Sequence, residues 1–358
     1  MLGCSLRCDS GCSSALVPSI LGEPPHEGIR GGKLYRMQGT VVGVIRGGPS
    51  REHEVSLATG AAVLANLAPE RFVSRDIYID KEGVWHERGR QVPPAHSLRG
   101  IDVALLALHG EYGEDGEIQR LLERAGVPYT GSSSFASYLA MHKVLSKERA
   151  RELGLKTPAY RLWEPETDLD ALTHEVTRSF HQPVVVKPVR WGSSVGVSIV
   201  GGYAALHKAL STLIAQDPGA ILIEEYIRGR EASVGVVEGL RGEQLYALPV
   251  VEIIPPEGDF FSYNAKYSGA TREVCPAHFS RVVTEDLAHA AKQAHRALGL
   301  RHYSRSDFIV APSGIYYLES NTLPGLTKES LLPKSLAAIG VSLRDFLSHL
   351  IDLALRRS

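Results

Sequence analysis

Alternating strand and helix signals, beginning near Thr40, constrain the fold of this chain more than any other feature. The apolar run over 41–45 is typical of a strand buried on both faces, and Gly47-Gly48 ends it. The segments that follow predict, in order, a helix over 55–67, strands over 73–79 and 102–108, a helix over 116–125 and a short strand over 127–129. This β-α-β order predicts a doubly wound parallel sheet, in which ligands collect at the carboxyl ends of the strands.

The remainder of the chain predicts two more lobes, so we expect an α/β fold with α+β character in the C-terminal lobe. The expected elements are a helix over 134–153, strands over 183–186 and 196–200, a helix over 206–214, a strand over 220–226, a strand-rich stretch over 244–254, a helix over 284–298, a hairpin around Pro312-Ser313-Gly314 and a helix from Leu343. The three lobes are expected to span roughly 37–140, 141–228 and 229–358.

Composition narrows the function classes. The 358 residues carry a formal net charge of −1, so no positive excess is available to bind nucleic acid or an anionic membrane. The apolar runs are far shorter than the roughly 20 residues that span a bilayer. With only four cysteines, the chain is expected to be cytoplasmic, without nucleic-acid or membrane partners.

Residues 1–36 differ from the rest of the chain, because they are rich in Gly, Ser and Pro and lack hydrophobic periodicity. We expect a disordered extension, or a start assigned upstream of Met37. Cys4, Cys8 and Cys12 leave a metal or redox role open, although their spacing fits neither a zinc pair nor a disulfide framework.

The hairpin around Ser313 carries two acids and an amide. If the hairpin is centred on Ser313, Asp307 lies opposite Glu319, and Arg305 lies opposite Asn321. Opposed carboxylates repel unless a positive charge lies between them. Carboxylate and amide oxygens suit Mg²⁺, with phosphates completing its coordination. A solvated hairpin face without a ligand explains the same residues equally well.

A second candidate site surrounds Lys187, which ends a buried strand before the small-residue loop over 192–196. Such a loop lets backbone N–H groups approach an anion, which suits a phosphate site. A plain flexible turn is the alternative, because no Walker A pattern is present. The strand ending in Glu224 and Glu225 can hold an adenine edge, and Glu231 can accept from ribose hydroxyls. A solvated strand end explains these acids equally well.

The loops after the first and third strands supply the last candidates. Glu54 stands at the mouth of a helix, placed to hold an ammonium group, although an acid there is also favourable to the helix dipole. His109 begins the loop after the third strand. A lone histidine is more often structural, but its place at the carboxyl end of a strand favours a functional role. Neither an H-E-x-x-H nor a G-x-S-x-G motif occurs, so zincin and nucleophile-elbow chemistries are not indicated.

Together these segments resemble the D-alanine–D-alanine ligases, a family of the ATP-grasp superfamily, from about residue 41 to 355. The resemblance rests on the motifs G-G-x-S-x-E-H-E-V-S, H-G-x-x-G-E-D-G, V-K-P-x-x-x-G-S-S-V-G, A-K-Y, R-x-D and E-x-N-T-x-P-G, which occur in this order. It implies a three-lobed ATP-grasp architecture. It also implies ATP-dependent joining of two D-alanines through an acyl phosphate, with release of ADP and phosphate, for peptidoglycan synthesis.

The resemblance also implies site residues. Those implied for ATP are Lys143, Lys187, Ser193, Glu224, Glu225, Tyr226, Ile227, Glu231 and Lys266. Two Mg²⁺ or Mn²⁺ ions would be held by Asp307, Glu319 and Asn321. The residues implied for the amino acids are Glu54, His109, Arg305, Gly325, Ser330 and Leu331. The catalytic set implied is Glu54, Ser193, Tyr267, Arg305 and Ser330, with Ser193 and Tyr267 hydrogen bonded to Glu54. A homodimer is implied by the family alone.

Several residues depart from the family pattern. Ser262 and Asn264 stand where the family usually has acids, His142 replaces the usual acid before Lys143, and Trp191 occupies a variable loop position. Sister ligases that take D-lactate or D-serine remain alternatives, and Tyr267 favours the dipeptide. A weakly active or binding-only homologue remains a further alternative, although the implied metal ligands are all present.

Overall fold

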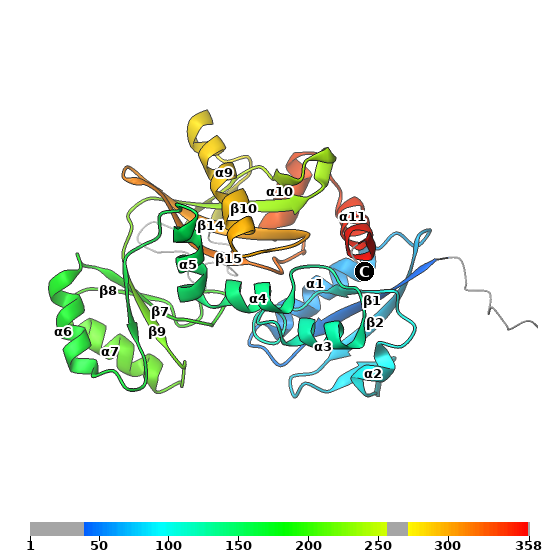
Figure 1. The fold of residues 1–358 in the computed structure, drawn as a ribbon, viewed down its shortest axis with the longest axis horizontal. Coiled ribbons are helices and arrows are strands. Elements are labelled where there is room, and N and C mark those ends of the chain that lie inside the picture. Colours follow the sequence, from blue (N-terminus) through cyan, green and yellow to red (C-terminus); the bar gives the residue numbers. More distant parts are fainter. Residues whose placement is uncertain (1–38, 256–270, 357–358) are drawn as a thin grey trace, which may run out of the picture. The chain divides into compact units, whose positions relative to one another are not determined.

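The structure is a computed structural model and describes residues 39–255 and 271–356. Residues from Gln38 onward group into one compact unit, in which the strands form three sheets (Figure 1). The expectations for residues 1–36, and those for Ser262, Asn264, Lys266 and Tyr267, lie outside the described residues. Within the described ranges, no helix is long and apolar enough to cross a membrane.

The first sheet has the strand order β4-β3-β2-β1-β5. Its strands are β1 (Thr40–Gly47), β2 (Phe72–Ile79), β3 (Trp85–Glu87), β4 (Arg90–Gln91) and β5 (Val103–Leu106). The parallel order is confirmed for β2, β1 and β5. The edge differs from the prediction, because β3 and β4 add an antiparallel hairpin. The short strand expected over 127–129 is reduced to a single parallel bridge between Tyr129 and Ala104.

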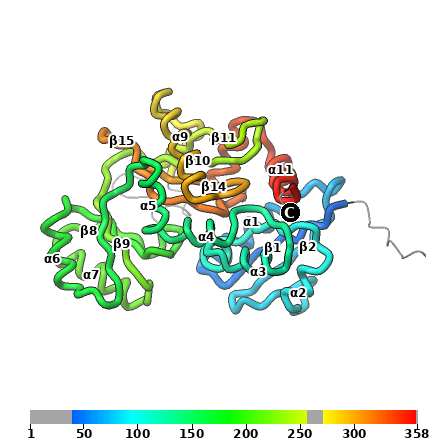
Figure 2. Tube along the Cα trace, in the orientation of Figure 1, coloured from blue at the N-terminus to red at the C-terminus, as the bar shows by residue number. Residues whose placement is uncertain are grey.

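The helices that pack against this sheet include the last helix of the chain. The helices of the first part are α1 (His53–Asn66), α2 (Pro94–Ser97) and α3 (Glu117–Ala125). The last helix, α11 (Leu343–Arg356), contacts β5 and α1, and its buried Phe346 and Leu350 belong to the same apolar core as Val44 and Leu105. Figure 2 shows α11, in red, beside the blue N-terminal elements. The lobe boundaries 37–140, 141–228 and 229–358 stay a prediction. α11 belongs to the third lobe by sequence but packs on the sheet of the first lobe.

The second sheet has the order β6-β9-β7-β8, with every pair antiparallel. Its elements are β6 (Tyr160–Trp163), β7 (Val184–Pro188), β8 (Ser198–Val200), β9 (Ile221–Glu225) and the helices α6 (Leu169–Ser179) and α7 (Tyr203–Ile214). Val184 and Val186 lie on the same face of β7, and they share an apolar core with Leu206 and Leu210 of α7. Lys187 therefore lies within a largely buried strand, and its pairing with Leu222 of β9 fixes its backbone.

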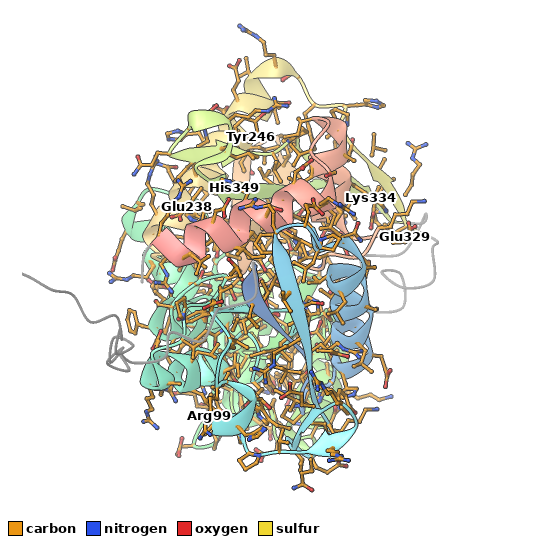
Figure 3. The ribbon with its side chains drawn as sticks, turned by 90° about the vertical axis from the view of Figure 1, so that its right-hand side faces the viewer. Arg99, Glu238, Tyr246, Glu329, Lys334 and His349 are labelled. Carbon is orange, nitrogen blue, oxygen red and sulfur yellow. The ribbon has the colours of Figure 1, made fainter. Side chains whose placement is uncertain are left out.

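The third sheet has the order β13-β12-β10-β14-β15, with β11 paired to β10. Its strands are β10 (Arg230–Glu238), β11 (Leu245–Ala247), β12 (Val251–Ile254), β13 (Arg272–Val274), β14 (Tyr303–Ala311) and β15 (Gly314–Asn321). The remaining helices are α4 (Ser134–Met141), α5 (Lys143–Glu152), α9 (Arg281–Ala297) and α10 (Leu331–Ala338), with a 3₁₀ turn η1 (Leu240–Gly242). His349 of α11 donates from Nε2 to the Glu238 carbonyl oxygen of β10 over 2.6 Å (Figure 3), which joins α11 to this sheet.

The predicted pairing of the β14–β15 hairpin is confirmed where the acids lie. Asp307 is paired with Glu319, and Arg305 with Asn321. Nearer the turn the register differs by one residue, because Phe308 pairs with Tyr317 and leaves Leu318 as a β-bulge. The turn is therefore one residue shorter than a hairpin centred on Ser313 requires, and the bulge restores the predicted opposition of the acids.

The helix expected over 134–153 is two helices instead of one. His142 interrupts it with φ −83° and ψ 96°, so it ends α4 and caps α5. The backbone N–H of Lys143 then bonds to the carbonyl of Val189 at the end of β7. This break turns Lys143 toward the second sheet, whereas a continuous helix would keep its N–H within the helix.

The packing of α11 gives a stability prediction. Phe346 is fully buried and meets the ring of Tyr303 edge to face at 5.6 Å. We expect Phe346→Ala to lower the free energy of unfolding by about 3–5 kcal/mol, because it removes a buried ring and leaves a cavity. Phe135, which is 69% exposed, supplies the matched control. Urea unfolding of Phe135→Ala should stay within about 0.5 kcal/mol of wild type, and equal losses for the two variants would contradict the packing.

Candidate nucleotide and amino-acid site

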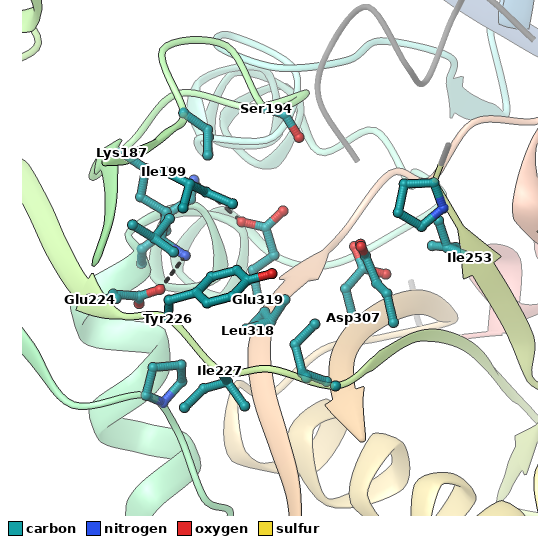
Figure 4. Close-up of a pocket in the computed structure, with 18 of the residues that line it drawn as sticks. Lys187, Ser194, Ile199, Glu224, Tyr226, Ile227, Ile253, Asp307, Leu318 and Glu319 are labelled. Carbon is teal, nitrogen blue, oxygen red and sulfur yellow. Dashed lines mark ion pairs between the residues drawn. The ribbon is translucent and has the colours of Figure 1, made fainter. Parts of the chain in front are cut away.

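A cleft of about 370 Å³ opens between the second and third sheets (Figure 4). The predicted site residues that line it are Lys143, Lys187, Glu224, Glu225, Tyr226, Ile227, Glu231, Asp307 and Glu319. Apolar side chains from both sheets complete the lining: Val185, Val197, Ile199, Ile253, Ile254 and Ile309. A flat apolar wall beside charged groups is the lining expected for a ligand with one aromatic end and one anionic end.

Glu224 is the charged centre of the cleft. Its carboxylate oxygens lie 2.7 Å from Lys147 Nζ and 2.8 Å from Lys187 Nζ, and all three side chains are less than a tenth exposed. Burial alone would raise the pKa of Glu224, but the two lysines together hold that pKa below its usual value. Lys147 also donates to the Leu318 carbonyl over 3.0 Å, and burial lowers its pKa to about 8.

Lys143 approaches the cleft from the start of α5. Its Nζ donates to the Trp191 carbonyl over 2.7 Å and lies 3.5 Å from Glu319 Oε2. Burial lowers its pKa, although Glu319 acts in the opposite direction. Lys143 and Lys187 therefore bring two ammonium groups into one cleft, as a polyphosphate site requires.

The two acids of the hairpin each have a cation from this chain. Arg305 binds Asp307 with both Nε and Nη2, at 3.0 and 2.8 Å, and Ser233 donates to Asp307 over 2.6 Å. The ammonium group of Lys143 lies 3.5 Å from Glu319 Oε2. Positive charge thus offsets the repulsion between the opposed carboxylates.

The same residues fit a magnesium ion. Asp307 and Glu319 supply carboxylate oxygens, and Asn321 supplies an amide oxygen, which also accepts from the Leu323 N–H over 3.0 Å. This is the hard-oxygen donor set that Mg²⁺ prefers, with room in the cleft for phosphate oxygens. Among residues 39–255 and 271–356, no group of three or more His, Cys, Asp or Glu side chains is placed to hold a metal ion, so the amide is needed to complete the set.

The predicted hydrogen bond between Ser193 and Glu54 is wrong. The Glu54 side chain is 76% exposed and pairs with Lys81 at 3.1 Å, whereas Ser193 donates to the buried Glu52. Residues two apart in a helical turn point to different sides, so only one of these acids can face inward. Of the two acids, Glu52 and not Glu54 therefore faces the loop that carries Ser193.

Glu52 lies in a cradle of small residues. A Cβ on either Gly110 or Gly192 would lie 2.7 Å from its Oε2, so a side chain at either position would push the carboxylate out of this place. The two glycines come from the loops after β5 and β7, which brings segments far apart in sequence together around one acid. The arrangement places a buried carboxylate beside the loops that follow β1, β5 and β7.

His109 and Glu114 lie close to Glu52 and are both buried. His109 Nε2 shares a hydrogen bond of 2.7 Å with Thr59, and burial lowers the pKa of His109 to about 4. Glu114 accepts from the N–H groups of Gly110 and Leu323. Burial, and then the neighbouring charge of Glu52, raise the pKa of Glu114 to about 8.

The remaining predicted residues gather at the start of α10. Ser330 precedes that helix and shares a hydrogen bond of 2.8 Å with Thr327, and a Cβ on Gly325 would meet Ser330 Oγ at 2.6 Å. Leu331 is the first, buried residue of α10. Gly325, Ser330 and Leu331 thus form one group at a helix N-terminus, where the helix dipole favours an anion.

Three residues of the site were missed by the sequence analysis. Lys147 had a usable signal, because it follows Lys143 by one helical turn and so shares its face. Glu52 and Glu114 stand inside the quoted motifs, but nothing in the local sequence says which acid turns inward. That choice depends on the cradle of Gly110 and Gly192, which only the folded loops create.

Comparison with known proteins identifies the family. Family models described as the D-ala D-ala ligase N-terminus and C-terminus match residues 41–96, 86–132 and 150–352. The chain belongs to the D-alanine–D-alanine ligase family. It is 42% identical to the D-alanine–D-alanine ligase of Syntrophobacter fumaroxidans and 40% identical to that of Geobacter sulfurreducens, covering 88% and 87% of this chain and 97% and 93% of those proteins.

Solved structures agree with this assignment. The D-alanine–D-alanine ligase of Bacillus anthracis is 36% identical with a TM-score of 0.76, covering 89% of this chain and 98% of that one. The VanG D-Ala:D-Ser ligase of Enterococcus faecalis is 29% identical with a TM-score of 0.78, covering 88% and 100%. The three-lobed ATP-grasp α/β architecture is thereby confirmed.

Neutral, buried His109 gives a pH prediction. An unfolded histidine titrates near 6.5, so between about pH 6.5 and 4 the unfolded chain binds a proton that the folded chain does not. His109 therefore makes stability fall as the pH decreases through this window, by on the order of 3 kcal/mol. Glu114, whose pKa is raised, changes stability with pH in the opposite direction, but it is present in both wild type and His109→Gln.

Urea unfolding of wild type and His109→Gln at about pH 7 and pH 4.5 measures this effect. We expect the variant to lose less stability on acidification than wild type, because glutamine does not titrate. The same loss in both proteins would contradict a buried neutral histidine.

Proposed function

We propose that this chain joins two D-alanine molecules into D-alanyl-D-alanine, with ATP converted to ADP and phosphate, for peptidoglycan precursor synthesis. The observation that carries the proposal is the opposition of Asp307 and Glu319 in the same cleft as Lys143 and Lys187. This arrangement supplies acids for metal ions and ammonium groups for phosphates at one place. Its family membership supports the reaction, since its curated relatives are named D-alanine–D-alanine ligases.

ATP is proposed to enter the cleft with its base between the apolar walls of the two sheets. The backbone of Glu225, Tyr226 and Ile227 would meet the adenine edge, with Glu224 beside it and Glu231 near the ribose. Lys143, Lys187 and the Gly-Ser loop containing Ser193 would hold the phosphates. A related structure, the Bacillus anthracis ligase complexed with ATP, has a TM-score of 0.73 to this chain. Lys266 is proposed as a further phosphate contact.

Asp307, Glu319 and Asn321 are proposed to hold Mg²⁺ or Mn²⁺. When bound, such ions neutralise charge on the phosphates and hold them in line for transfer. The chain's own cations contribute to the same task, because Arg305 and Lys143 lie beside the two carboxylates.

The first D-alanine is proposed to lie with its ammonium group near Glu52. His109 stays neutral because it is buried, so it adds no positive charge that would repel that ammonium. Arg305 and the N–H of Gly325 would stabilise the oxyanion that forms at the reacting carbonyl. The N-terminus of α10, with Ser330 and Leu331, is placed to receive the carboxylate of the second D-alanine.

Two transfers complete the reaction. A carboxylate oxygen of the first D-alanine attacks the γ-phosphorus of ATP, ADP leaves, and an acyl phosphate forms. The second D-alanine loses a proton from its ammonium group, its amine attacks the acyl carbon, and phosphate leaves as the peptide bond forms. Excluding water protects the acyl phosphate from hydrolysis. Tyr267 is proposed to help close the site.

Other features are proposed from the family likeness: a homodimer, a cytoplasmic location and lobes over 37–140, 141–228 and 229–358. D-Serine is the second candidate for the acceptor, because the VanG D-Ala:D-Ser ligase is among the structural neighbours.

The reaction is tested by incubating the protein with ATP, Mg²⁺ and D-alanine and measuring ADP together with the product mass. We expect D-alanyl-D-alanine from wild type and a loss of at least about 100-fold in Glu319→Ala, because the phosphates lose a proposed metal ligand. Removal of Mg²⁺ with EDTA should stop turnover. ADP release that appears only with D-serine or D-lactate as acceptor would overturn the dipeptide assignment.

Glu52 and Glu54 form a matched pair for testing the ammonium site. We expect Glu52→Gln to lower kcat/KM for D-alanine by about 10- to 100-fold, because a charged hydrogen bond to the substrate is lost. Glu54→Gln should stay within about twofold of wild type, since its side chain is exposed. Steady-state kinetics decide between them, and the reverse order would restore Glu54 to the site.

A further inference from the structure

Two neighbouring residues of the turn before α1 hold the Gly-Ser loop over 190–196. The Arg51 guanidinium carbon lies 3.7 Å from the centroid of the Trp191 ring, and Glu52 accepts a hydrogen bond from Ser193. We propose that Arg51 and Trp191 form a clasp that positions the Gly-Ser loop over the nucleotide cleft. Both are positioning residues, and their effect on turnover rests on the proposed ligase function.

The loop has a backbone that needs outside support. Ser193 and Ser194 have φ of 48° and 57°, so two consecutive residues with a Cβ occupy the left-handed region. This region is disfavoured for L-residues other than glycine, and it persists only where surrounding contacts hold it. Glu52 holds the loop at Ser193, and the clasp holds it two residues earlier.

Trp191 connects the clasp to the charged groups of the cleft. The residue is only 8% exposed and lines the cleft, and its carbonyl accepts from Lys143 Nζ over 2.7 Å. Lys143 in turn lies 3.5 Å from Glu319. A shift of Trp191 therefore displaces the acceptor of a lysine proposed to bind phosphate.

Arginine over tryptophan is a favourable pairing for such a clasp. The indole face is the best aromatic partner for a cation, and the planar guanidinium stacks on it more closely than an ammonium group does. Arg51 is exposed, so replacing it leaves no buried charge behind. Trp191 also packs in the core of the second sheet, and substitutions at Arg51 separate the clasp from that packing role.

The kinetic test uses Arg51→Met, which keeps the length of the stem and removes the cation. We expect kcat/KM for ATP to fall by about 3- to 30-fold, mainly through KM. The ratio of ADP released to dipeptide formed should rise, because a misplaced loop admits water to the acyl phosphate. Arg51→Lys should recover part of the loss, and Arg51→Met should have no further effect in a Trp191→Leu background.

Arg161→Met is the matched control, because Arg161 also lies over an aromatic ring, that of Phe180 at 5.4 Å, and pairs with Glu175 away from the cleft. It should stay within about twofold of wild type. Equal kinetics for Arg51→Met and wild type would show that Trp191 serves only the core, and would overturn the clasp.

A second readout does not depend on turnover. The chain has three tryptophans, so subtracting the fluorescence of Trp191→Phe from that of wild type isolates Trp191. Acrylamide should quench this signal more strongly in Arg51→Met, because the guanidinium no longer covers the ring. Unchanged quenching would overturn the clasp. Increased quenching in a protein that makes no dipeptide would retain the clasp and reject the proposed function.

Discussion

A single buried carboxylate, Glu224, ties together the segments that form the cleft. Lys147 and Lys187 bind its two oxygens, so ion pairs reach from α5 and β7 to β9. Removing one partner of such a buried cluster typically costs about 3–5 kcal/mol, because a charge is left without its counterion. Lys147 also donates to the Leu318 carbonyl. The same cluster therefore links the second sheet, through Lys147 of α5, to the hairpin of the third sheet.

Leu318, whose carbonyl accepts from Lys147, is the bulged residue of the hairpin. β15 is the edge strand of its sheet, so carbonyl groups on its outer side are left for partners other than β14. The same bulge sets Asp307 opposite Glu319. The feature that joins the sheets thus also places the two acids side by side, where Arg305 and Lys143 offset their repulsion.

Most of the fold was predictable, and so was part of the site. Strands β1, β2 and β5 of the first sheet and the hairpin that carries Asp307 and Glu319 follow from local patterns, because apolar runs and turn residues are encoded by neighbours in sequence. The edge hairpin of β3 and β4 was not predicted, since its short strands carry little apolar signal. The break at His142 was missed because it depends on a backbone bond from Lys143 to Val189.

The sequence by itself determined most of the order of the elements, the motif residues and the hairpin that carries the acids, whereas the bulge that sets their register was found only in the structure. The tertiary structure decided which acid of the first loop turns inward, which lysine completes the buried cluster and what holds the Gly-Ser loop. Glu52 and Glu54 differ little in local sequence. Glu52 alone meets Ser193 and the space left by Gly110 and Gly192. A side chain's burial depends on partners from distant segments, and their positions are known only once the chain has folded.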